Sequence, residues 1–594
     1  MDDGMMMASQ PQIMDSLCVA VAGQGGDGSL TLVTLIARAL ADYGYHIYES
    51  RNVASRIKGG HAAAFLRAGV DPVPAQGHDL DLLIAFDVEA IEILGPRVVE
   101  NGVIIFDSSS EPCPMGGLKA GVEIVDVPFG RYAVRELRRD LYKNSLGYAV
   151  TCAILGLKGD LVRAKMREVY SRLPANVIAA NLAAMETGFQ VAGNFGYRGG
   201  RSRWQPRTLN PTPKHHMTGN EALAFGFLAA GGRFFAGYPI TPATDIMEWL
   251  EKYLPDLGGV VIQAEDELAS INMALGAAMT GARTMTASSG PGIALMTEGI
   301  SQAGSAELPV VIVNCQRAGP STGMPTKPEQ SDIGLMTQGA NGDFPRVVLC
   351  PATPGECFEA GRLATDIAEI AQIPVFVALD QVVAQDKATF TLPHMGSLTI
   401  NRGKRLAGTK GPGGPDYRRY QLTDDGISPW TIPGTPEGMS LVTGNERNEW
   451  GHVDTGPDNR RRMMDKRARK LETISAMLPT AVNWGDASSE IGIIGVGMER
   501  GVMRDLTSLL AKQNKSAAFH SPRTLWPVLP ETLEFIAGKS RVFVIEHNQE
   551  GQLFRLLGGA LASRSHMTNI TRYDGRAFSP EDLFRRLHEE GADL

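Results

Sequence analysis

The stretch SLCVAVAGQGGDGSLTLVTLIARALADYG, residues 16–44, decides the fold of the N-terminal part of the chain. Its first eight residues are almost wholly apolar and predict a buried strand, whereas TLVTLIARALADYG repeats apolar residues at helical spacing. Between them lies a glycine-rich turn, which predicts a tight connection from strand to helix. The stretch therefore predicts the opening of a βαβ unit.

Further apolar segments continue this alternation. HIYES, LLIAFD, GVIIFDS and VEIVDVP read as strands and alternate with helical segments, so we predict an open, mostly parallel, Rossmann-like sheet over residues 14–195. A Met-rich leader, 1–13, precedes it. Residues 196–216 mix Arg, Gly, Pro and Asn without an apolar period, which predicts a linker.

Two more α/β units are expected after the linker. Over 217–385, the strands RFFAGYP, VVIQAED, RTMTASSG, PVVIVNC and PVFVALD alternate with helices such as ELASINMALGAAMTGA. Residues 386–485 are polar and irregular and end in a basic connecting helix, NRRRMMDKRARKLETI. Residues 486–594 return to strands and helices. The predicted fold class is α/β, multidomain, with three α/β units.

The composition agrees with several domains and excludes some partners. A chain of 594 residues is expected to fold as about three or four units. The net charge of −8 and the absence of a basic stripe argue against nucleic acid. With no long apolar window and an acidic start, we expect a cytoplasmic protein without a membrane segment. The six cysteines form no C-x-x-C pair, so any cluster chemistry is expected on a partner.

The turn between the first strand and helix is a candidate phosphate site, because glycines let backbone N–H groups and the helix N-terminus approach an anion. Its residues are Gly23, Gln24, Gly25, Gly26, Asp27 and Gly28. Three interpretations stay open. Glu49, 21 positions after Gly28, could bind the ribose of NAD; Asp27 and Asn52 imitate the GDG…N signature for magnesium and thiamine diphosphate; and the turn could be purely structural.

A basic segment follows the second predicted strand. It contains Arg51, Asn52, Arg56 and Lys58. Such a cluster suits a polyanion, and coenzyme A, with its phosphates, is one candidate. A solvated basic loop is the alternative.

The second unit carries candidate contacts where its strands end. Tyr238, Pro239, Ile240 and Thr241 join a strand to a helix, where Thr241 could cap the helix, contact a ligand, or do both. Ser288 and its glycine-rich neighbours, and the segment around Arg317, follow two other strands and should line the same edge.

Two kinds of charged residue at this edge have alternative roles. Glu265 and Glu267 open a helix, where acids usually just favour the helix dipole, but a desolvated carboxyl could share a proton with a cofactor ring nitrogen. Arg317 can bind a carboxylate bidentately or can lie on the surface. Lys327, farther along the same segment, could meet a second carboxylate of the same ligand.

Three motifs together carry a family resemblance. GYPITP, AEDELASINMALGAAMTGARTMTASSGPG and QRAGPSTGMPTKPEQSD resemble the alpha subunit of the 2-oxoacid:ferredoxin oxidoreductases, and the 2-oxoglutarate branch especially. GQGGDG with RNVASRIKGGH resembles the family's gamma domain, fused in front, and VIEHNQEGQLFRLLGG is similar to its transketolase C-terminal-like domain. The likeness covers nearly the whole chain.

The resemblance implies a thiamine diphosphate site shared with another subunit. This chain would supply the pyrimidine-binding half, with Glu267 at N1′ and Glu265 as the fallback carboxylate. A beta subunit would supply the diphosphate half with Mg²⁺ and a [4Fe-4S] cluster, in a dimer of alpha–beta heterodimers, so this chain binds no metal of its own. Thr241 and Arg317 would bind the 2-oxoacid, and the gamma domain would help to bind coenzyme A.

The implied reaction is the oxidative decarboxylation of a 2-oxoacid with coenzyme A to an acyl-CoA, with ferredoxin or a similar acceptor taking the electrons. 2-Oxoglutarate, giving succinyl-CoA, is favoured, but pyruvate and branched-chain 2-oxoacids stay open. Two rival classes also stay open. One is a scaffold subunit that binds coenzyme A or a nucleotide without a catalytic residue, and the other is an NAD(P)-dependent dehydrogenase.

Overall fold

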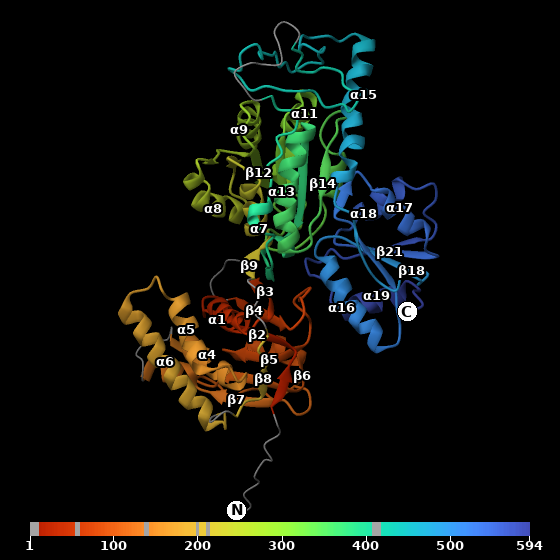
Figure 1. Cartoon of the computed structure of the whole chain (residues 1–594). Coiled ribbons are helices and arrows are strands. Elements are labelled where there is room, and N and C mark those ends of the chain that lie inside the picture. The colour runs from red at the N-terminus through yellow and green to blue at the C-terminus, as the bar shows by residue number, and fades with distance from the viewer. Residues whose placement is uncertain (1–10, 54–59, 136–141, 198–200, 210–213, 407–416) are drawn as a thin grey trace, which may run out of the picture. The chain divides into compact units, whose positions relative to one another are not determined.

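The computed structural model describes residues 11–53, 60–135, 142–197, 201–209, 214–406 and 417–594. The strands of these residues form four sheets, with helices and loops between successive strands (Figure 1). The chain divides into two compact units, one of residues 1–216 with 386–391 and the other of 217–385 with 392–594. The predicted α/β class is confirmed.

The first unit is built on an eight-stranded sheet of order β7-β6-β5-β2-β4-β3-β16-β9. The strands are β2 (Ser16–Gln24), β3 (His46–Val53), β4 (His61–Gly69), β5 (Leu80–Ala85), β6 (Val98–Asp107), β7 (Glu123–Val127), β9 (His215–Thr218) and β16 (Lys387–Phe390). Strands β2, β5, β6 and β7 are parallel, but β4 is antiparallel to β2 and β3, and β16 to β3. The sheet is therefore mixed, not mostly parallel as expected, because β3 and β4, which follow one another along the chain, pair antiparallel.

Helices cover both faces of this sheet. They are α1 (Ser29–Asp42), α2 (Val88–Leu94), α3 (Phe129–Arg135), α4 (Lys143–Ile154), α5 (Gly159–Val169) and α6 (Ala175–Asn194). The larger core lies between the sheet and α1, α4, α5 and α6, which Figure 1 shows beside the sheet. A smaller core includes Ala90, Ile91 and Leu94 of α2. Parts of the expected leader and linker form a two-stranded sheet, in which β1 (Gln12–Met14) pairs with β8 (Trp204–Pro206).

The second unit contains a seven-stranded sheet of order β11-β10-β12-β13-β15-β14-β20. Its strands are β10 (Phe234–Gly237), β11 (Val260–Gln263), β12 (Thr284–Ser288), β13 (Val310–Gln316), β14 (Val347–Leu349), β15 (Pro374–Asp380) and β20 (Thr524–Trp526). All neighbours pair in parallel except β14 and β20. The carboxyl ends of β10, β12, β13 and β15 therefore meet at one edge.

The helices of this part connect successive strands across the sheet faces. They are α7 (Gly219–Ala229), α8 (Thr244–Tyr253), α9 (Glu267–Met279), α10 (Gly290–Leu295), α11 (Thr297–Ala306), α12 (Ile333–Gln338), α13 (Pro354–Ala371) and α14 (Gln381–Gln385). Two glycines let α7 and α13 pack closely, since a Cβ at Gly226 would lie 1.9 Å from the Phe358 carbonyl and one at Gly361 2.3 Å from the Leu223 carbonyl.

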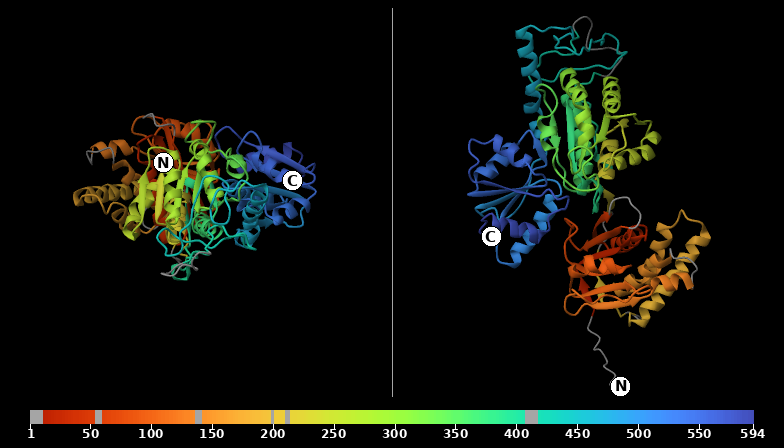
Figure 2. Two further views of the ribbon diagram at one scale, coloured as in Figure 1. Left: turned by 90° about the horizontal axis from the view of Figure 1, so that it is seen from above. Right: turned by 180° about the vertical axis from the view of Figure 1, so that it is seen from behind.

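A five-stranded sheet of order β17-β19-β18-β21-β22 completes the second unit. It comprises β17 (Val482–Gly485), β18 (Ile491–Gly495), β19 (Ala518–Ser521), β21 (Arg541–Glu546) and β22 (Met567–Thr571), with α16 (Glu499–Lys512), α17 (Pro530–Ala537), α18 (Gln552–Gly559) and α19 (Pro580–Glu589) around it (Figure 2). One hydrophobic core joins the two sheets, because Ile312, Val544 and Leu553 belong to the same buried cluster.

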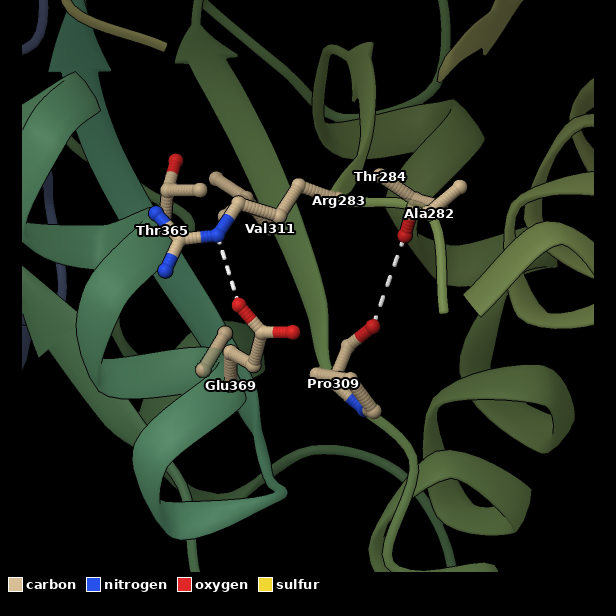
Figure 3. A pocket seen from close by; sticks show the side chains of 8 residues that line it. Ala282, Arg283, Thr284, Pro309, Val311, Thr365 and Glu369 are labelled. Atoms are coloured by element: carbon tan, nitrogen blue, oxygen red, sulfur yellow. Dashed lines mark hydrogen bonds and ion pairs between the residues drawn. The ribbon is translucent and has the colours of Figure 1, made fainter. Parts of the chain in front are cut away.

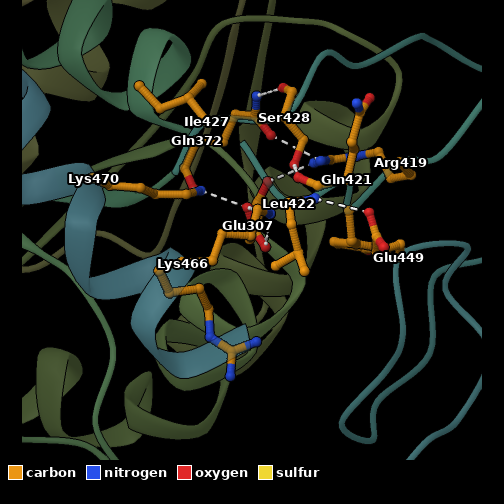
Figure 4. Close-up of polar contacts among 12 residues, drawn as sticks. Glu307, Gln372, Arg419, Gln421, Leu422, Ile427, Ser428, Glu449, Lys466 and Lys470 are labelled. Atoms are coloured by element: carbon orange, nitrogen blue, oxygen red, sulfur yellow. Dashed lines mark hydrogen bonds and ion pairs between the residues drawn. The ribbon is translucent and has the colours of Figure 1, made fainter. Parts of the chain in front are cut away.

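The expected basic helix is present as α15 (Pro457–Ile474), and a buried ion cluster fixes it. Lys466 and Lys470 both contact the carboxylate of Glu307, at 2.7 and 2.6 Å (Figure 4). Arg419 donates to the Glu307 carbonyl, which links the polar segment before α15 to the same cluster. Lys466 and Lys470 of α15 are thus buried partners of one acid.

A small cavity lies at the amino ends of β12 and β13, away from the candidate site. Arg283, which precedes β12, lines it and donates to Glu369 of α13 at 2.6 Å (Figure 3). Arg283 also donates to Asp366 of α13 at 2.7 Å. Because both carboxylates are thus paired with this arginine, we interpret the cavity as structural.

Candidate active site

The side chains predicted for a site in the second unit follow strands whose carboxyl ends share one edge. Thr241 follows β10, Glu267 follows β11, and Arg317 follows β13. In parallel α/β sheets this edge presents ligand contacts. The fold therefore brings three distant segments to one side of the sheet.

Arg317 and Thr241 are in direct contact. The Arg317 side chain is buried, with the residue 7% exposed, and its Nη1 donates to the Thr241 carbonyl at 2.7 Å. Its Nε is buried without a hydrogen-bond partner, and burial lowers the pKa of the guanidinium. A buried arginine with an unused donor is suited to bind an incoming anion.

Thr241 does not cap the following helix, so that part of the prediction is wrong. Helix α8 begins at Thr244, and its N-cap is Ala243. The reason is a tight turn, in which the Ala243 and Thr244 N–H groups both donate to the Ile240 carbonyl, at 2.8 and 3.1 Å. In the same turn Tyr238 is 43% exposed, and Pro239 and Ile240 are half-buried.

Glu267 is the first residue of α9 and is 6% exposed. Asp266 is the N-cap of this helix and accepts from the Ala269 N–H at 2.7 Å, so the Glu267 side chain is not needed for capping. Ser288 Oγ donates to Glu267 Oε1 over a long 3.5 Å. A Cβ at Gly292 would lie 2.6 Å from that oxygen, so glycine leaves room for the carboxylate. Glu265 is exposed.

Other buried polar atoms at this edge lack a protein partner. They are Ser289 Oγ, in the turn after β12, and Asn314 Oδ1, near the end of β13. Buried polar groups in native proteins are nearly always hydrogen-bonded. Together with Arg317 Nε, these atoms indicate a surface whose hydrogen bonds are completed by a ligand or by water.

Asp332 is a residue of this site that the sequence analysis did not single out. Its carboxylate accepts from Asn314 Nδ2 at 3.2 Å, and its backbone N–H donates to Gln316 Oε1 at 3.1 Å. Burial raises the pKa of Asp332 to about 6. It stands directly before α12, where an acid is normally a cap, but its side chain makes no capping bond. Because an acid at this position is expected to be only a cap, the sequence analysis did not single out Asp332.

Lys327 lies in the same loop as Arg317, and its carbonyl accepts from the Ala318 N–H at 3.0 Å. The residue is half-buried. The Lys327 backbone is thus paired with the residue that directly follows Arg317.

In the first unit, the glycine-rich turn is closed largely upon itself. The Gln24 N–H donates to Asp27 Oδ2 at 2.9 Å, and Gly25 donates to the Gly60 carbonyl at 3.0 Å. Asp27 also pairs with Lys143 at 2.7 Å. A carboxylate occupied in this way does not support the magnesium-binding interpretation of Asp27, and Asn52 lies on β3, which β4 separates from β2.

The NAD interpretation lacks its geometry as well. Glu49 is also on β3, so it does not stand on the strand next to the glycine turn as a ribose-binding acid would. It is buried beside Thr34 and His216. Arg51 and Asn52 are exposed, whereas Arg56 and Lys58 lie outside the described residues.

A buried amide that sequence reasoning missed lies beside the glycine-rich turn of the first unit. Asn144, at the start of α4, has its Oδ1 buried without a partner and lies against Gly28, where a Cβ would come within 2.0 Å of Asn144 Nδ2.

Among the described residues, no group of three or more His, Cys, Asp and Glu side chains has the arrangement of a metal site. Within the same residues, no helix is both long and apolar enough to span a bilayer.

Two protein-family models match the chain. The model for pyruvate ferredoxin/flavodoxin oxidoreductase matches residues 18–191, and the thiamine diphosphate-binding model of pyruvate flavodoxin/ferredoxin oxidoreductase matches 226–421. The 2-oxoacid:ferredoxin oxidoreductase subunit alpha of Saccharolobus solfataricus is 30% identical over 90% of this chain and 92% of its own length. The 2-oxoglutarate synthase subunit KorA of Methanothermobacter thermautotrophicus is 32% identical over 63% of this chain and 98% of its own.

A solved structure is similar over nearly the whole length. The 2-oxoglutarate:ferredoxin oxidoreductase of Magnetococcus marinus, with 2-oxoglutarate, coenzyme A and succinyl-CoA bound, superposes with a TM-score of 0.89 at 31% identity. The match covers 97% of this chain and 99% of that one.

Proposed function

This chain belongs to the 2-oxoacid:ferredoxin oxidoreductase family, and we propose that it is the fused gamma–alpha subunit of an enzyme that converts 2-oxoglutarate and coenzyme A to succinyl-CoA and carbon dioxide. The observation that carries this proposal is the buried carboxylate of Glu267 on the same sheet edge as the Arg317–Thr241 contact. Ferredoxin is the proposed electron acceptor.

The residues of the second unit fit the pyrimidine half of thiamine diphosphate. Glu267 is buried, is not needed as a cap and makes only a long hydrogen bond, so its carboxyl is available to a ring nitrogen such as N1′. Tyr238, Pro239 and Ile240 would flank the ring from the turn after β10. When bound, thiamine diphosphate supplies the electron sink for decarboxylation. Glu267 would hold a proton at the ring nitrogen in a pocket that excludes water.

The 2-oxoacid would be bound by its carboxylate. Arg317 is held through Nη1, and its buried Nε is left for an anion. Thr241 would contact the substrate through its hydroxyl, since its carbonyl is already used by Arg317. Lys327 is the candidate for the second carboxylate of 2-oxoglutarate. The relatives named for this substrate support that choice over pyruvate.

Coenzyme A is proposed to bind through the first unit. The similar solved structure from Magnetococcus marinus holds bound coenzyme A, which supports a coenzyme A site in this chain as well. The glycine turn from Gly23 to Gly28, the buried Asn144 and the exposed Arg51 are the polar and basic groups available here. Domain limits are proposed accordingly, with a gamma domain over 14–195, a pyrimidine-binding domain over 217–385 and a transketolase C-terminal-like domain over 486–594.

A beta subunit is proposed to complete the enzyme. It would carry the diphosphate half-site with Mg²⁺ and the [4Fe-4S] cluster, in a dimer of alpha–beta heterodimers. The relatives' designation as subunit alpha supports a second chain.

The test is to purify this chain with its co-encoded partner and to assay reduction of ferredoxin with coenzyme A and a panel of 2-oxoacids. We expect turnover with 2-oxoglutarate that requires thiamine diphosphate, and slower turnover with pyruvate. A purified complex that contains thiamine diphosphate but turns over no 2-oxoacid would refute the proposal.

A further inference from the structure

The C-terminal motif EHNQEGQ, residues 546–552, lies against the loop that carries Arg317. We call residues 546–552 the tail turn and residues 316–332 the substrate loop. The tail turn runs from the last residue of β21 to the first residue of α18, and the substrate loop begins at the last residue of β13. The two segments are more than 200 residues apart in sequence, yet they are joined by many hydrogen bonds, such as that between Asn548 and Gln330.

The substrate loop closes around Arg317. Gln316 Oε1 accepts from the Asp332 N–H at 3.1 Å, and the Ala318 N–H donates to the Lys327 carbonyl at 3.0 Å. The residues on either side of Arg317 are thus bonded to residues 327–332, which we call the returning arm of the loop. We therefore expect a displacement of that arm to move Arg317.

Gln330, in the returning arm, is held from all sides and is 1% exposed. Its N–H donates to the His547 carbonyl at 2.6 Å, and its carbonyl accepts from Asn548 Nδ2 at 3.1 Å. Its side-chain Nε2 donates to the Val496 carbonyl at 3.0 Å and to Asp380 at 3.3 Å. The tail turn therefore binds both the backbone N–H and the backbone carbonyl of this residue.

Gln552 binds the same arm on both sides of Asp332. Its Nε2 donates to the Ser331 carbonyl at 2.6 Å, and its Oε1 accepts from the Gly334 N–H at 2.8 Å. Gln552 is half-buried and is the first residue of α18. Its side chain can therefore be changed with little disturbance of the core.

The tail turn is itself rigid. Glu546, at the end of β21, accepts from Asn548 Nδ2 at 2.7 Å and from the Leu553 N–H at 2.8 Å, and Asn548 Oδ1 accepts from the Gly551 N–H at 2.7 Å. Because this rigid turn is bound to the substrate loop, the loop has little conformational freedom before a substrate binds. It therefore loses less conformational entropy when the substrate binds.

We propose that the tail turn positions the substrate loop, with Gln330, Asn548 and Gln552 as positioning residues for Arg317 and Asp332. The proposal rests on the proposed function, because it assigns Arg317 to the 2-oxoacid. It gives the C-terminal domain a role in binding the 2-oxoacid and none in binding coenzyme A.

The test compares Gln552→Met with Asn459→Leu in the purified complex. Asn459 is the control, because its side chain also makes two hydrogen bonds to loop backbone, here to the carbonyls of Arg447 and Asp454 at 3.0 Å, but that loop lies elsewhere. We expect Gln552→Met to raise KM for 2-oxoglutarate about tenfold and to leave KM for coenzyme A unchanged. Gln552→Glu, which keeps the acceptor for Gly334 but sets an oxygen against the Ser331 carbonyl, should also raise it.

Hydrogen–deuterium exchange supplies a second readout that does not depend on activity. The peptide covering the substrate loop should exchange faster in Gln552→Met than in the wild type, and should be unchanged in Asn459→Leu. An unchanged KM for 2-oxoglutarate, an equal rise for coenzyme A, or equal effects of both variants would overturn the proposal. A wild-type complex that does not turn over 2-oxoglutarate would instead refute the proposed function.

Discussion

The guanidinium of Arg317 donates from Nη1 to the backbone carbonyl of Thr241 across 2.7 Å. This contact joins the loops after β10 and β13 and fixes the direction of the guanidinium. Because Nε is buried without a partner, the remaining face of the group is available to a carboxylate. The contact therefore leads to a specific expectation for substrate binding.

Replacing Arg317 by Lys should raise KM for the 2-oxoacid about 100-fold, because an ammonium group cannot keep the Thr241 contact and bind a carboxylate bidentately. Steady-state kinetics of the purified complex measures this. Arg346→Lys is the control, since Arg346 is also buried and bonds the carbonyl of Gly339 but lies away from the sheet edge. Equal rises in the two variants would remove Arg317 from the substrate site.

Replacing Glu267 by Gln should lower turnover by about 10²–10⁴-fold, because the amide cannot hold the proton at the cofactor ring. The complex should stay assembled, as judged by size-exclusion chromatography. Glu265→Gln, at the exposed neighbouring acid, should retain activity. Full activity of Glu267→Gln would favour a scaffold role in which the acids of this turn only support the helix.

The local sequence was sufficient to predict those candidate site residues that directly follow a strand. Thr241, Glu267 and Arg317 each follow a strand with a clear apolar pattern, and parallel pairing then brings them to one edge. The Ala-rich strand β4 was not recognised, because HAAAFLRAG has weak strand propensity. The contacts of Asp332 were missed because its partners, the side chains of Asn314 and Gln316, lie on another segment that no local pattern pairs with it. Those of Gln552 were out of reach because its partners, the backbones of Ser331 and Gly334, are more than 200 residues away and leave no residue pattern.

Replacing Glu307 by Gln should destabilise the second unit by about 3–5 kcal/mol, because it leaves the buried Lys466 and Lys470 without their shared counter-charge. Calorimetric unfolding of the full chain measures the change. The control is Asp425→Asn, which breaks the half-exposed pair with Lys404 and should cost less than about 1 kcal/mol. Similar costs for both variants would contradict the importance assigned to the buried cluster.

Glu49 makes the stability of the first unit depend on pH. Its carboxylate is buried on β3, accepts from Thr34 Oγ1 at 3.3 Å and lies 3.4 Å from His216 Nε2. Burial raises the pKa of Glu49 from its ordinary value of 4.5 to about 7. Burial also lowers the pKa of His216 to about 3, so the imidazole is neutral at neutral pH and gives the carboxylate no positive partner.

A carboxyl whose pKa is raised on folding binds its proton more tightly in the folded state. Its contribution to stability is therefore complete below pH 4.5 and is lost as the pH rises through 7. Glu49→Gln mimics the protonated form, so it should be more stable than the wild type at pH 8, by up to about 3 kcal/mol, and nearly equal to it at pH 5. Because His216 is present in both proteins, its own titration largely cancels in the comparison. Calorimetry at the two pH values measures the difference, with the exposed Glu168→Gln as control. A stability difference that is the same at both pH values would show that Glu49 does not titrate in this window.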